Sequence, residues 1–393
     1  MKILFLSRWF PWPMNNGSKI RIYNLLRGLS QHHDVTLLSF ADQPEVSPDA
    51  PEVREICSDV RVVPWREFNP STLGARLAIL NLKPRSVVDT FSVDMANAIT
   101  ETLNKQQYDL VIASQLQMAA YYPYFQNLPA LFEEIEIGLF HDQAFSADGK
   151  IRFRHALTWF KLRMYLSRLL DSFQACTVAS AQEQQLILQS FPSYKKMVKI
   201  IPNCLNVDEY KNINVEKKSN TLIFSGPFKY KANYDAMLWF VGEVFPLVLE
   251  KKPDTQLIIT GDHANLPLPS LRNITLAGYV DDIKARIASS TISIAPLLSG
   301  GGTRLKILEA MALGTSVVAT SKGAEGLDAR TEEHLVIADS ADTFASSILQ
   351  LFQETDLRQK LVENSQKLVY EKYDWGGVMP TFLELLEKSI RKN

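Results

Sequence analysis

Short apolar runs alternate with longer helical patterns along most of the chain. The first run, Lys2 to Ser7, is almost wholly apolar and has the length of a strand that is covered on both faces. Apolar residues then recur at helical spacing from Ile20 to Gln31, and a second apolar run follows at residues 34–40. Strand, helix and strand in this order predict a parallel sheet whose faces are covered by helices.

The same alternation continues through the first half of the chain. Further apolar runs of strand length are separated by segments with helical spacing, and this pattern predicts a doubly wound α/β domain. The further strands are predicted at residues 59–65, 108–114, 129–135, 173–180 and 198–203.

The apolar pattern lapses near residues 203–218, where Asn and Lys are frequent, and a second series of strands and helices follows. A chain of 393 residues is too long for one core of ordinary size. We therefore predict two similar α/β domains, each opening with a strand, a loop that contains glycine and a helix. The predicted domains are residues 1–203 and 219–373, with a linker at 204–218 and a C-terminal helical segment at 374–393 that packs back toward the first domain.

The composition restricts the kinds of partner. The chain is 46% hydrophobic and 22% charged with a formal net charge of −1, which argues against a general affinity for nucleic acid, so any anion site is local. Cys57, Cys176 and Cys204 are widely spaced and lack the spacing of metal ligands, so we expect a reducing compartment, no disulfide and no zinc. No apolar run reaches the roughly 18 residues of a membrane span, and we expect a cytoplasmic protein.

The stretch from Ser299 to Thr320 is the strongest candidate for a ligand site. Gly300, Gly301 and Gly302 let the backbone approach a ligand closely, and a helix predicted to begin near Thr303 points its unpaired N–H groups at the same place. This arrangement predicts an anion site. The alternative is a strand, turn and helix whose glycines only make the turn tight. The apolar residues of the helix keep the spacing of a packed face, so the polar side chains that could reach a ligand are Arg304, Lys306 and Glu309.

Two other loops of the second half also follow predicted strands. Gly226 ends the first of these strands, and Lys229 and Lys231 come soon after it, where they could meet a diphosphate as point charges. Gly278 and Tyr279 end a later strand. Because open α/β sheets bind ligands at the carboxyl ends of their strands, we predict that these residues bind the same ligand. The alternative for the lysines is that they are only solvated.

The first half has its own candidates at the carboxyl edge of its predicted sheet. Gly17 stands in a run of Asn and Ser before the first helix and suits a close approach to phosphate or sugar, although it could also serve only as a helix cap. The segment 133–136 contains three glutamates and precedes His141 and Asp142. Such a cluster could hold a substrate hydroxyl, whereas His141 alone could be an ordinary surface or core histidine.

Residues 153–170 form an amphipathic basic pattern. His155, Trp159 and three leucines fall on one side of the predicted helix, and basic residues at sevenfold spacing stand opposite. A solvated surface helix would explain this pattern, and so would a patch for anionic lipid headgroups or a phosphate-bearing acceptor. The basic residues are Arg154, Lys161 and Arg168.

The residues PLLSGGGTRLKILEAMALGTSVVAT, with weaker support from IIPN, GPFKYKANYDA and GYVDD, resemble the retaining glycosyltransferases of family 4. The resemblance covers nearly the whole chain and implies the GT-B architecture, in which two Rossmann-like domains face each other across a cleft. The family has a pair of glutamates eight positions apart. Its second member corresponds to Glu309, which would bind the ribose hydroxyls of a nucleotide sugar, and its first corresponds to Gly301, where the acid is lost.

The resemblance also implies an activity. The donor would be a nucleoside-diphosphate sugar and the acceptor a glycan or a lipid-linked glycan of surface polysaccharide biosynthesis, with retention of anomeric configuration and without a metal or cofactor. His141, Lys231 and Glu309 are the expected catalytic residues, and the glycine loops with Arg304 and Lys306 would hold the donor. The alternatives are a nucleotide-sugar epimerase of the same architecture and a non-catalytic partner protein.

Overall fold

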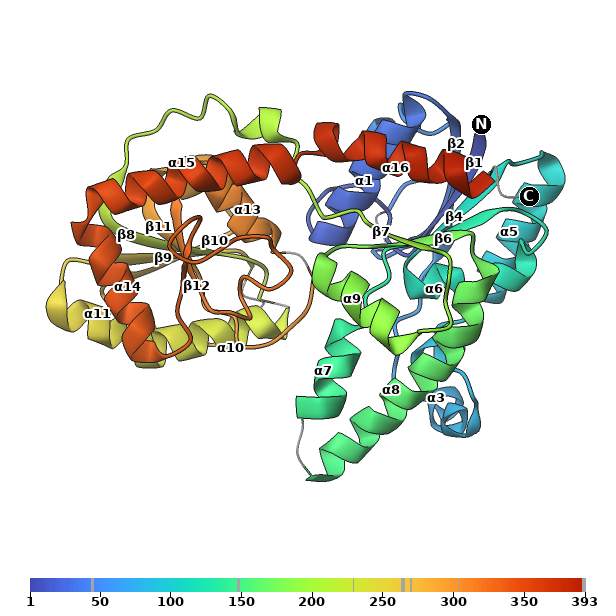
Figure 1. Ribbon diagram of the computed structural model, residues 1–393, viewed down its shortest axis with the longest axis horizontal. Helices are drawn as coiled ribbons and strands as arrows, with labels where there is room; N and C mark the ends of the chain where they lie inside the picture. The colour runs from blue at the N-terminus through green and yellow to red at the C-terminus, as the bar shows by residue number, and fades with distance from the viewer. Residues whose placement is uncertain are drawn as a thin grey trace. The chain divides into compact units, whose positions relative to one another are not determined.

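A computed structural model describes the chain except residues 44–45, 147–148, 229, 263–265, 269–270, 303 and 391–393. The chain divides into two compact units (Figure 1). We call Met1–Asn203 together with Met379–Asn393 the N-terminal unit, and Cys204–Val378 the C-terminal unit. Residues 204–217, predicted as a linker, belong to the C-terminal unit and include a short 3-10 helix, η4 (Val207–Tyr210).

The N-terminal unit is built on a parallel sheet of seven strands in the order β3-β2-β1-β4-β5-β6-β7. Successive strands run outward from β1 on one side and then outward from β4 on the other, so the sheet has a topological switch point between β1 and β4. The prediction of a doubly wound α/β domain is confirmed. The strands are β1 (Lys2–Ser7), β2 (Asp34–Ala41), β3 (Asp59–Pro64), β4 (Leu110–Ser114), β5 (Ala130–Glu133), β6 (Ala175–Val178) and β7 (Met197–Ile200).

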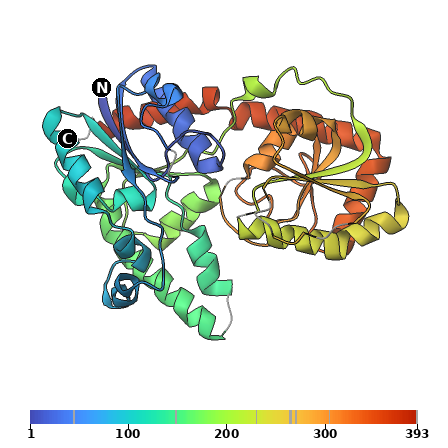
Figure 2. The same ribbon diagram turned by 180° about the vertical axis from the view of Figure 1, so that it is seen from behind.

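Helices cover both faces of this sheet (Figures 1 and 2), and the strands are correspondingly apolar, with Leu4 and Phe132 fully buried. The helices are α1 (Gly17–Ser30), α2 (Pro51–Arg54), α3 (Leu73–Leu77), η1 (Ala78–Leu80), α4 (Arg85–Asp89), α5 (Val93–Lys105), α6 (Gln115–Ala119), η2 (Tyr122–Tyr124), α7 (Gly138–Ser146), α8 (Gly149–Leu169), η3 (Leu170–Ser172) and α9 (Ala181–Ser190). The end of the chain returns to this unit in α16 (Trp375–Ile390), where the side chain of Met379 fills the space that a Cβ at Gly28 of α1 would need.

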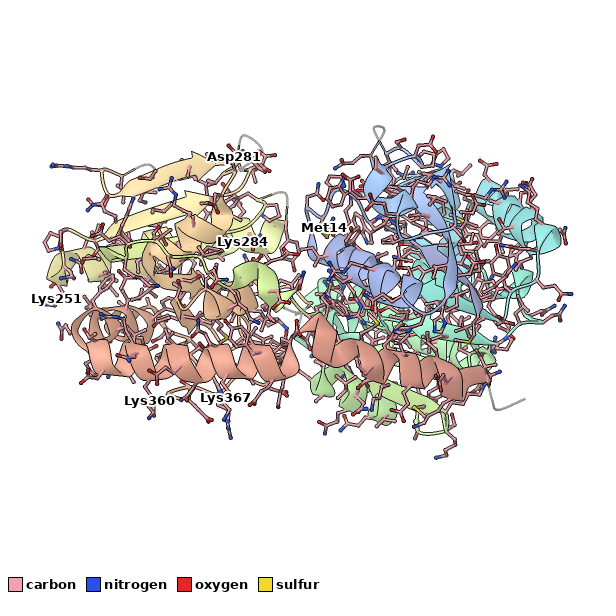
Figure 3. The ribbon with its side chains drawn as sticks, turned by 90° about the horizontal axis from the view of Figure 1, so that it is seen from above. Met14, Lys251, Asp281, Lys284, Lys360 and Lys367 are labelled. Atoms are coloured by element: carbon pink, nitrogen blue, oxygen red, sulfur yellow. The ribbon has the colours of Figure 1, made fainter. Side chains whose placement is uncertain are left out.

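The C-terminal unit repeats the plan with a parallel sheet in the order β10-β9-β8-β11-β12-β13. Its strands are β8 (Lys218–Ser225), β9 (Gln256–Thr260), β10 (Ile274–Gly278), β11 (Ser290–Ala295), β12 (Ser316–Ala319) and β13 (Val336–Ile337). Its remaining helices are α10 (Lys231–Trp239), the π-helix η5 (Phe240–Val244), α11 (Phe245–Lys251), α12 (Ile283–Ser289), α13 (Leu305–Ala312), α14 (Ala341–Gln353) and α15 (Thr355–Lys372). On α15, Lys360 and Lys367 project away from the unit (Figure 3). The expectation of two Rossmann-like domains is confirmed.

Helix α13 is the helix predicted to follow the triple glycine. It begins at Leu305, with Arg304 in the N-cap position, and its apolar face buries Ile307, Leu308 and Met311. Gly314 ends it with a φ of +66°, a conformation that glycine adopts without strain. Thr303, predicted at the start of the helix, lies outside the described residues. Among the described helices, none has the length and apolar character needed to cross a membrane.

Candidate functional site

Gly226 lies at the carboxyl end of β8, where the C-terminal unit has room for backbone but not for a side chain. A Cβ at Gly226 would lie 2.7 Å from Asn233 Nδ2 and 2.9 Å from Lys306 Nζ. The loop therefore lies directly against an amide and an ammonium group that come from α10 and α13. The lack of a side chain at Gly226 is what allows this contact.

Lys306 supplies a half-buried cation at this place. Its Nζ donates a hydrogen bond to Asn233 Oδ1 at 2.8 Å and lies 4.2 Å from the centre of the Phe224 ring. Asn233 is buried, and its Nδ2 donates a hydrogen bond to Pro227 O at 2.8 Å, which fixes the side chain. Burial, together with the nearby charge of Arg304, lowers the pKa of Lys306 to about 7. Within the described part of the chain, no carboxylate forms an ion pair with this ammonium, so the site favours an anionic ligand.

Arg304 is buried and holds the glycine loop in place. Its guanidinium donates to Gly301 O at 2.9 Å, to Gly300 O at 2.9 Å and to Lys322 O at 3.1 Å. Its Nε is buried without a hydrogen-bond partner among the described residues. Most of the guanidinium is thus used within the loop, so the predicted contact of Arg304 with the donor stays a prediction.

The loop itself packs on the segment before α10. Gly300 has a φ of +98°, and a Cβ there would overlap the hydroxyl of Tyr230. Gly301 is half-buried and Gly302 is exposed, so the backbone at this point is open to a ligand. The next residue along from Tyr230, Lys231, is 82% exposed and pairs with Asp235 at 2.6 Å. Of the two lysines predicted after Gly226, Lys231 is thus a surface residue and Lys229 lies outside the described residues.

Glu309 stands further along α13 and accepts a hydrogen bond from the hydroxyl of Tyr210 at 2.9 Å. Burial raises the pKa of Glu309, and the Tyr210 hydrogen bond and the charges of Lys284 and Lys306 act against that shift. Tyr210 comes from η4, and Lys284 Nζ lies 4.4 Å from the centre of its ring. Tyr279, which was predicted near the ligand, is 84% exposed after the turn at Gly278.

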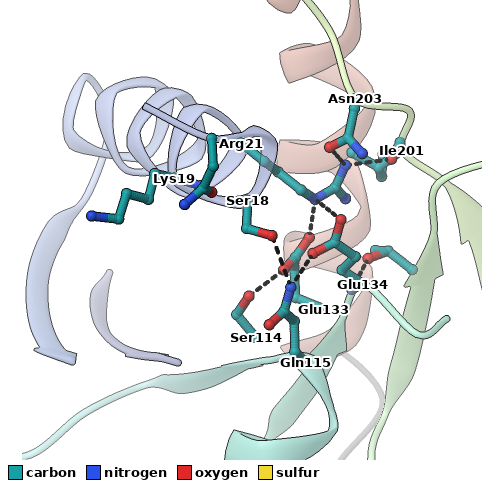
Figure 4. A network of polar contacts seen from close by, with 11 residues as sticks. Ser18, Lys19, Arg21, Ser114, Gln115, Glu133, Glu134, Ile201 and Asn203 are labelled. Carbon is teal, nitrogen blue, oxygen red and sulfur yellow. Dashed lines mark hydrogen bonds and ion pairs between the residues drawn. The ribbon is translucent and has the colours of Figure 1, made fainter. Parts of the chain in front are cut away.

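The N-terminal unit carries a buried ion pair at the carboxyl end of β5 (Figure 4). Arg21 Nε lies 2.6 Å from Glu133 Oε1, and neither side chain is exposed. The other carboxylate oxygen accepts from Ser114 Oγ at 2.6 Å, while Arg21 also donates to Ile201 O and Asn203 Oδ1. Sequence reasoning missed Arg21 because it looks like a surface residue of an amphipathic helix.

Gly17 is the first residue of α1, and the preceding Asn16 caps the helix by accepting from Lys19 N at 3.0 Å. The observed cap of α1 is thus Asn16, directly before Gly17. The predicted contact of Gly17 with a ligand stays a prediction. Lys19 itself is fully buried, with Nζ 2.9 Å from Asp42 Oδ2.

The residues predicted to cluster around His141 have several different contacts in the structure. His141 lies on α7, where its ring packs 4.6 Å from the ring of Phe145 and 5.4 Å from that of Trp159, and its Nδ1 is 3.7 Å from Asp142 Oδ1. Glu133 turns instead into the buried pair with Arg21. Glu133 and His141 thus have different partners, and the role predicted for this group of residues at a substrate hydroxyl stays a prediction.

The basic helix is α8. Its predicted apolar side is confirmed, since Trp159, Leu162 and Leu166 are buried. Arg154 and Arg168 are exposed, but Lys161 donates to Ile79 O of η1 and ties the two elements together. The three basic residues thus do not form one free surface.

Known proteins resemble this chain in both sequence and fold. Residues 219–354 match the family model described as Glycosyl transferases group 1. The chain is 23% identical to an uncharacterized 44.6 kDa protein in the cps region of Klebsiella pneumoniae, over 95% of this chain and 96% of that protein. It is 28% identical to a phosphatidyl-myo-inositol mannosyltransferase of Mycobacterium leprae, over 48% of this chain and 52% of that protein.

The fold is similar to solved structures over essentially the whole length. Sucrose-phosphate synthase from Thermosynechococcus elongatus has a TM-score of 0.71 at 16% identity and covers 100% of both chains. The Anabaena protein Alr3699/HepE, solved in complex with UDP-glucose, has a TM-score of 0.64 at 13% identity and covers 98% of this chain and 99% of its own. The chain thus has the GT-B fold, and its residues 219–354 are similar to the group 1 glycosyl transferases.

The part of the chain that matches the family model contains Gly226, Asn233, Lys306 and Glu309. Asn233 could not be recognised as a site residue without the fold, because its partner Lys306 is 73 positions away. The buried pair centred on Arg21 lies outside the matched residues.

Proposed function

We propose that the protein transfers a sugar from a nucleoside-diphosphate sugar to a glycan or glycolipid acceptor with retention of anomeric configuration. The observation that carries the proposal is the half-buried ammonium of Lys306 beside Gly226, in a place without a carboxylate partner among the described residues. Breaking the bond between the sugar and the diphosphate places negative charge on the leaving group. A fixed ammonium next to exposed backbone stabilises such charge where it develops.

Glu309 suits the nucleoside part of the donor. One of its carboxylate oxygens already accepts from Tyr210, which holds the side chain in place and leaves the other oxygen for a ribose hydroxyl. Because Lys306 supplies positive charge at the diphosphate, we further propose that the transfer needs no divalent metal. Activity that is lost in EDTA and restored by Mg²⁺ or Mn²⁺ would contradict this part.

The related proteins guide the choice of substrates. The solved complex of Alr3699/HepE contains UDP-glucose, so we propose a uridine nucleotide sugar as the first donor to test. One relative is named for its place in a cps region and another as a phosphatidyl-myo-inositol mannosyltransferase. Both names favour a surface glycan or a glycolipid as acceptor.

The experiment is to incubate the full chain with UDP-, GDP- and ADP-sugars and to measure free nucleoside diphosphate, first alone and then with glycolipid extracts. Release that rises with an acceptor supports transfer, and NMR of the product's anomeric proton tests retention. Conversion of one donor sugar into another would indicate an epimerase. Nucleotide binding without any turnover would indicate a non-catalytic partner.

An apolar and basic surface of the N-terminal unit supports an acceptor at a membrane. Leu80 of η1 is 86% exposed and Phe153 of α8 is 75% exposed. A cavity of about 580 Å³ in the same unit is lined by Leu82 and Lys83, which follow η1, and by Arg168 near the end of α8. Apolar side chains with basic neighbours are typical of surfaces that bind anionic lipid.

We propose peripheral contact of this surface with an anionic membrane. The variant Phe153→Ser/Arg154→Ala should sediment less with vesicles that contain phosphatidylglycerol, and Lys161 is left intact because it bonds to Ile79 O. The matched control is Lys360→Ala/Lys367→Ala, which removes two exposed cations from α15. Equal sedimentation of both variants and the wild type would contradict the proposal.

A further inference from the structure

Two residues of the N-terminal unit stand at the ligand edge of its sheet. Gln115 directly follows β4 and Glu134 directly follows β5, and these strands are neighbours. Strand β4 also borders the topological switch point next to β1, and open α/β sheets bind their ligands at the carboxyl ends of strands at this point. The two residues therefore lie where this sheet is expected to meet a substrate.

Both residues have a backbone conformation that side chains other than glycine rarely adopt. The φ angle is +67° at Gln115 and +55° at Glu134. Such a conformation persists only where surrounding contacts enforce it, and it gathers at functional sites. Here the backbone of Glu134 is held by one residue of β6, since Glu134 N donates to Thr177 Oγ1 at 2.8 Å and Ile135 N donates to Thr177 O at 2.8 Å.

The side chains of Gln115 and Glu134 contact each other (Figure 4). Gln115 Nε2 donates to Glu134 Oε2 at 2.8 Å and reaches Ser18 Oγ at 3.4 Å, so it joins the ends of β4 and β5 to the start of α1. Among the described residues, no hydrogen bond reaches Gln115 Oε1. An amide oxygen and a carboxylate are thus held side by side.

Glu134 differs from its neighbour Glu133 in what it can reach. Glu133 is fully buried, and its two oxygens are occupied by Arg21 and Ser114. Glu134 is 3.6 Å from Arg21 Nε but keeps 11% of its side chain exposed, and Gln115 is half-buried. Glu134 Oε1 thus faces Arg21 and its Oε2 accepts from Gln115, but each carboxylate oxygen has a second lone pair, so the partly exposed carboxylate can still accept a hydrogen bond from a ligand.

We propose that Glu134 and Gln115 form a subsite that binds hydroxyl groups of a sugar by accepting hydrogen bonds from them. This proposal rests on the proposed function, because the sugar would be part of either the acceptor or the donor. Paired hydroxyl groups of a sugar match an adjacent carboxylate and amide oxygen. The strained backbone keeps both side chains at the sheet edge, where glycine would provide no acceptor group.

The test uses the full chain and methyl glycosides of glucose, galactose and mannose as probes, observed by saturation-transfer NMR. Glu134→Gln and Gln115→Asn should each weaken binding of the glycoside that the wild type binds best by at least about tenfold. Asn is too short to reach Glu134, but it adopts the left-handed backbone with less strain than Gln, which offsets the lost hydrogen bond, so the melting temperature of Gln115→Asn should stay near that of the wild type. The matched control is Glu55→Gln, which removes an exposed carboxylate elsewhere in the N-terminal unit and should bind like the wild type.

Two further measurements show whether the sugar belongs to the donor or to the acceptor, and distinguish failure of this proposal from failure of the proposed function. If UDP-glucose displaces the glycoside and UDP does not, the subsite belongs to the donor sugar, and if neither displaces it, the subsite belongs to the acceptor. Affinity for UDP, measured by calorimetry, tests the proposed function and should be unchanged in Glu134→Gln. The subsite proposal would be overturned if the wild type bound no glycoside or if the variants bound it equally well. It would also be overturned if a variant lost affinity for both glycoside and UDP together with a fall in melting temperature.

Discussion

The two units have the same kind of sheet but differ in the residues with positive φ at its carboxyl edge. In the C-terminal unit, the described residues with positive φ at this edge are glycines, including Gly226 and Gly300. In the N-terminal unit, they are Gln115 and Glu134. Glycine brings the backbone close to a ligand and suits a diphosphate, whereas a strained Gln or Glu retains a side chain that can read hydroxyl groups.

The two units also differ in the partners of their buried basic side chains. Arg21 is matched by Glu133 in the N-terminal unit, while Lys306 in the C-terminal unit faces an amide and a phenyl ring. We therefore interpret the matched pair as part of the folded scaffold, and Lys306, which forms no ion pair among the described residues, as the cation proposed to meet the ligand. The following predictions test this difference.

The largest expected effect is on stability. Arg21→Met leaves the carboxylate of Glu133 buried without its cation, which should lower the free energy of unfolding by about 3–5 kcal/mol. Lys306→Met removes a cation whose burial is unfavourable, so this variant should be at least as stable as the wild type. Urea denaturation with hydrogen exchange of each unit measures both. Equal losses of stability in the two variants would contradict the distinction between scaffold and ligand site.

The next effect is on nucleotide binding. Lys306→Met should weaken binding of UDP by about 10- to 100-fold, because a hydrogen bond to a charged group contributes about 1.5–3 kcal/mol. Lys231→Met should cost less than about fivefold, since an exposed cation that already pairs with Asp235 contributes about 0–1 kcal/mol. Calorimetry of UDP binding measures both values. The reverse order would restore Lys231 as the main cation of the site.

Much of this architecture could be predicted from the sequence. The alternation of apolar runs and helical patterns predicts the strands of both sheets, and the run from Gly300 to Gly302 predicts a loop open to a ligand. These features depend on neighbouring residues, so a local pattern contains them.

The partners of the site residues could not be predicted, because they come from distant segments. Lys306 and Asn233 are 73 positions apart, and Glu309 and Tyr210 are 99 apart. Periodicity likewise places Arg304 among the polar side chains of its helix, yet the structure buries it, and three carbonyl oxygens accept hydrogen bonds from its Nη atoms. Tertiary contacts override the local pattern at these positions.

A moderate effect is expected from pH. The pKa of Lys306 is lowered to about 7 in the free protein, and a bound diphosphate should raise it because it favours the charged form. Binding then takes up a proton, so the affinity for UDP should fall as pH rises above about 7, by at most tenfold per pH unit. Calorimetry at several pH values, in buffers of different ionisation enthalpy, measures the slope and the proton uptake. A slope that persists in Lys306→Met would assign it to another group, with Glu309 the first to test.

The smallest effect concerns the strained backbone. Glu332 in the C-terminal unit is exposed with a φ of +60°. Left-handed backbone costs about 1–2 kcal/mol in residues with a side chain, and glycine gives back about 0.5–1 kcal/mol through chain entropy. Glu332→Gly should therefore raise the free energy of unfolding by up to about 1.5 kcal/mol. Gln115→Gly relieves the same strain but loses a hydrogen bond to Glu134 that contributes about 0.5–1.5 kcal/mol, so its stability should stay near that of the wild type. Thermal and urea unfolding compare the two variants. If Gln115→Gly lowered the free energy of unfolding by more than about 2 kcal/mol, the loss would exceed the contribution of one such hydrogen bond, and Gln115 would be a structural residue. The two sheet edges would then differ only in the contacts that stabilise them.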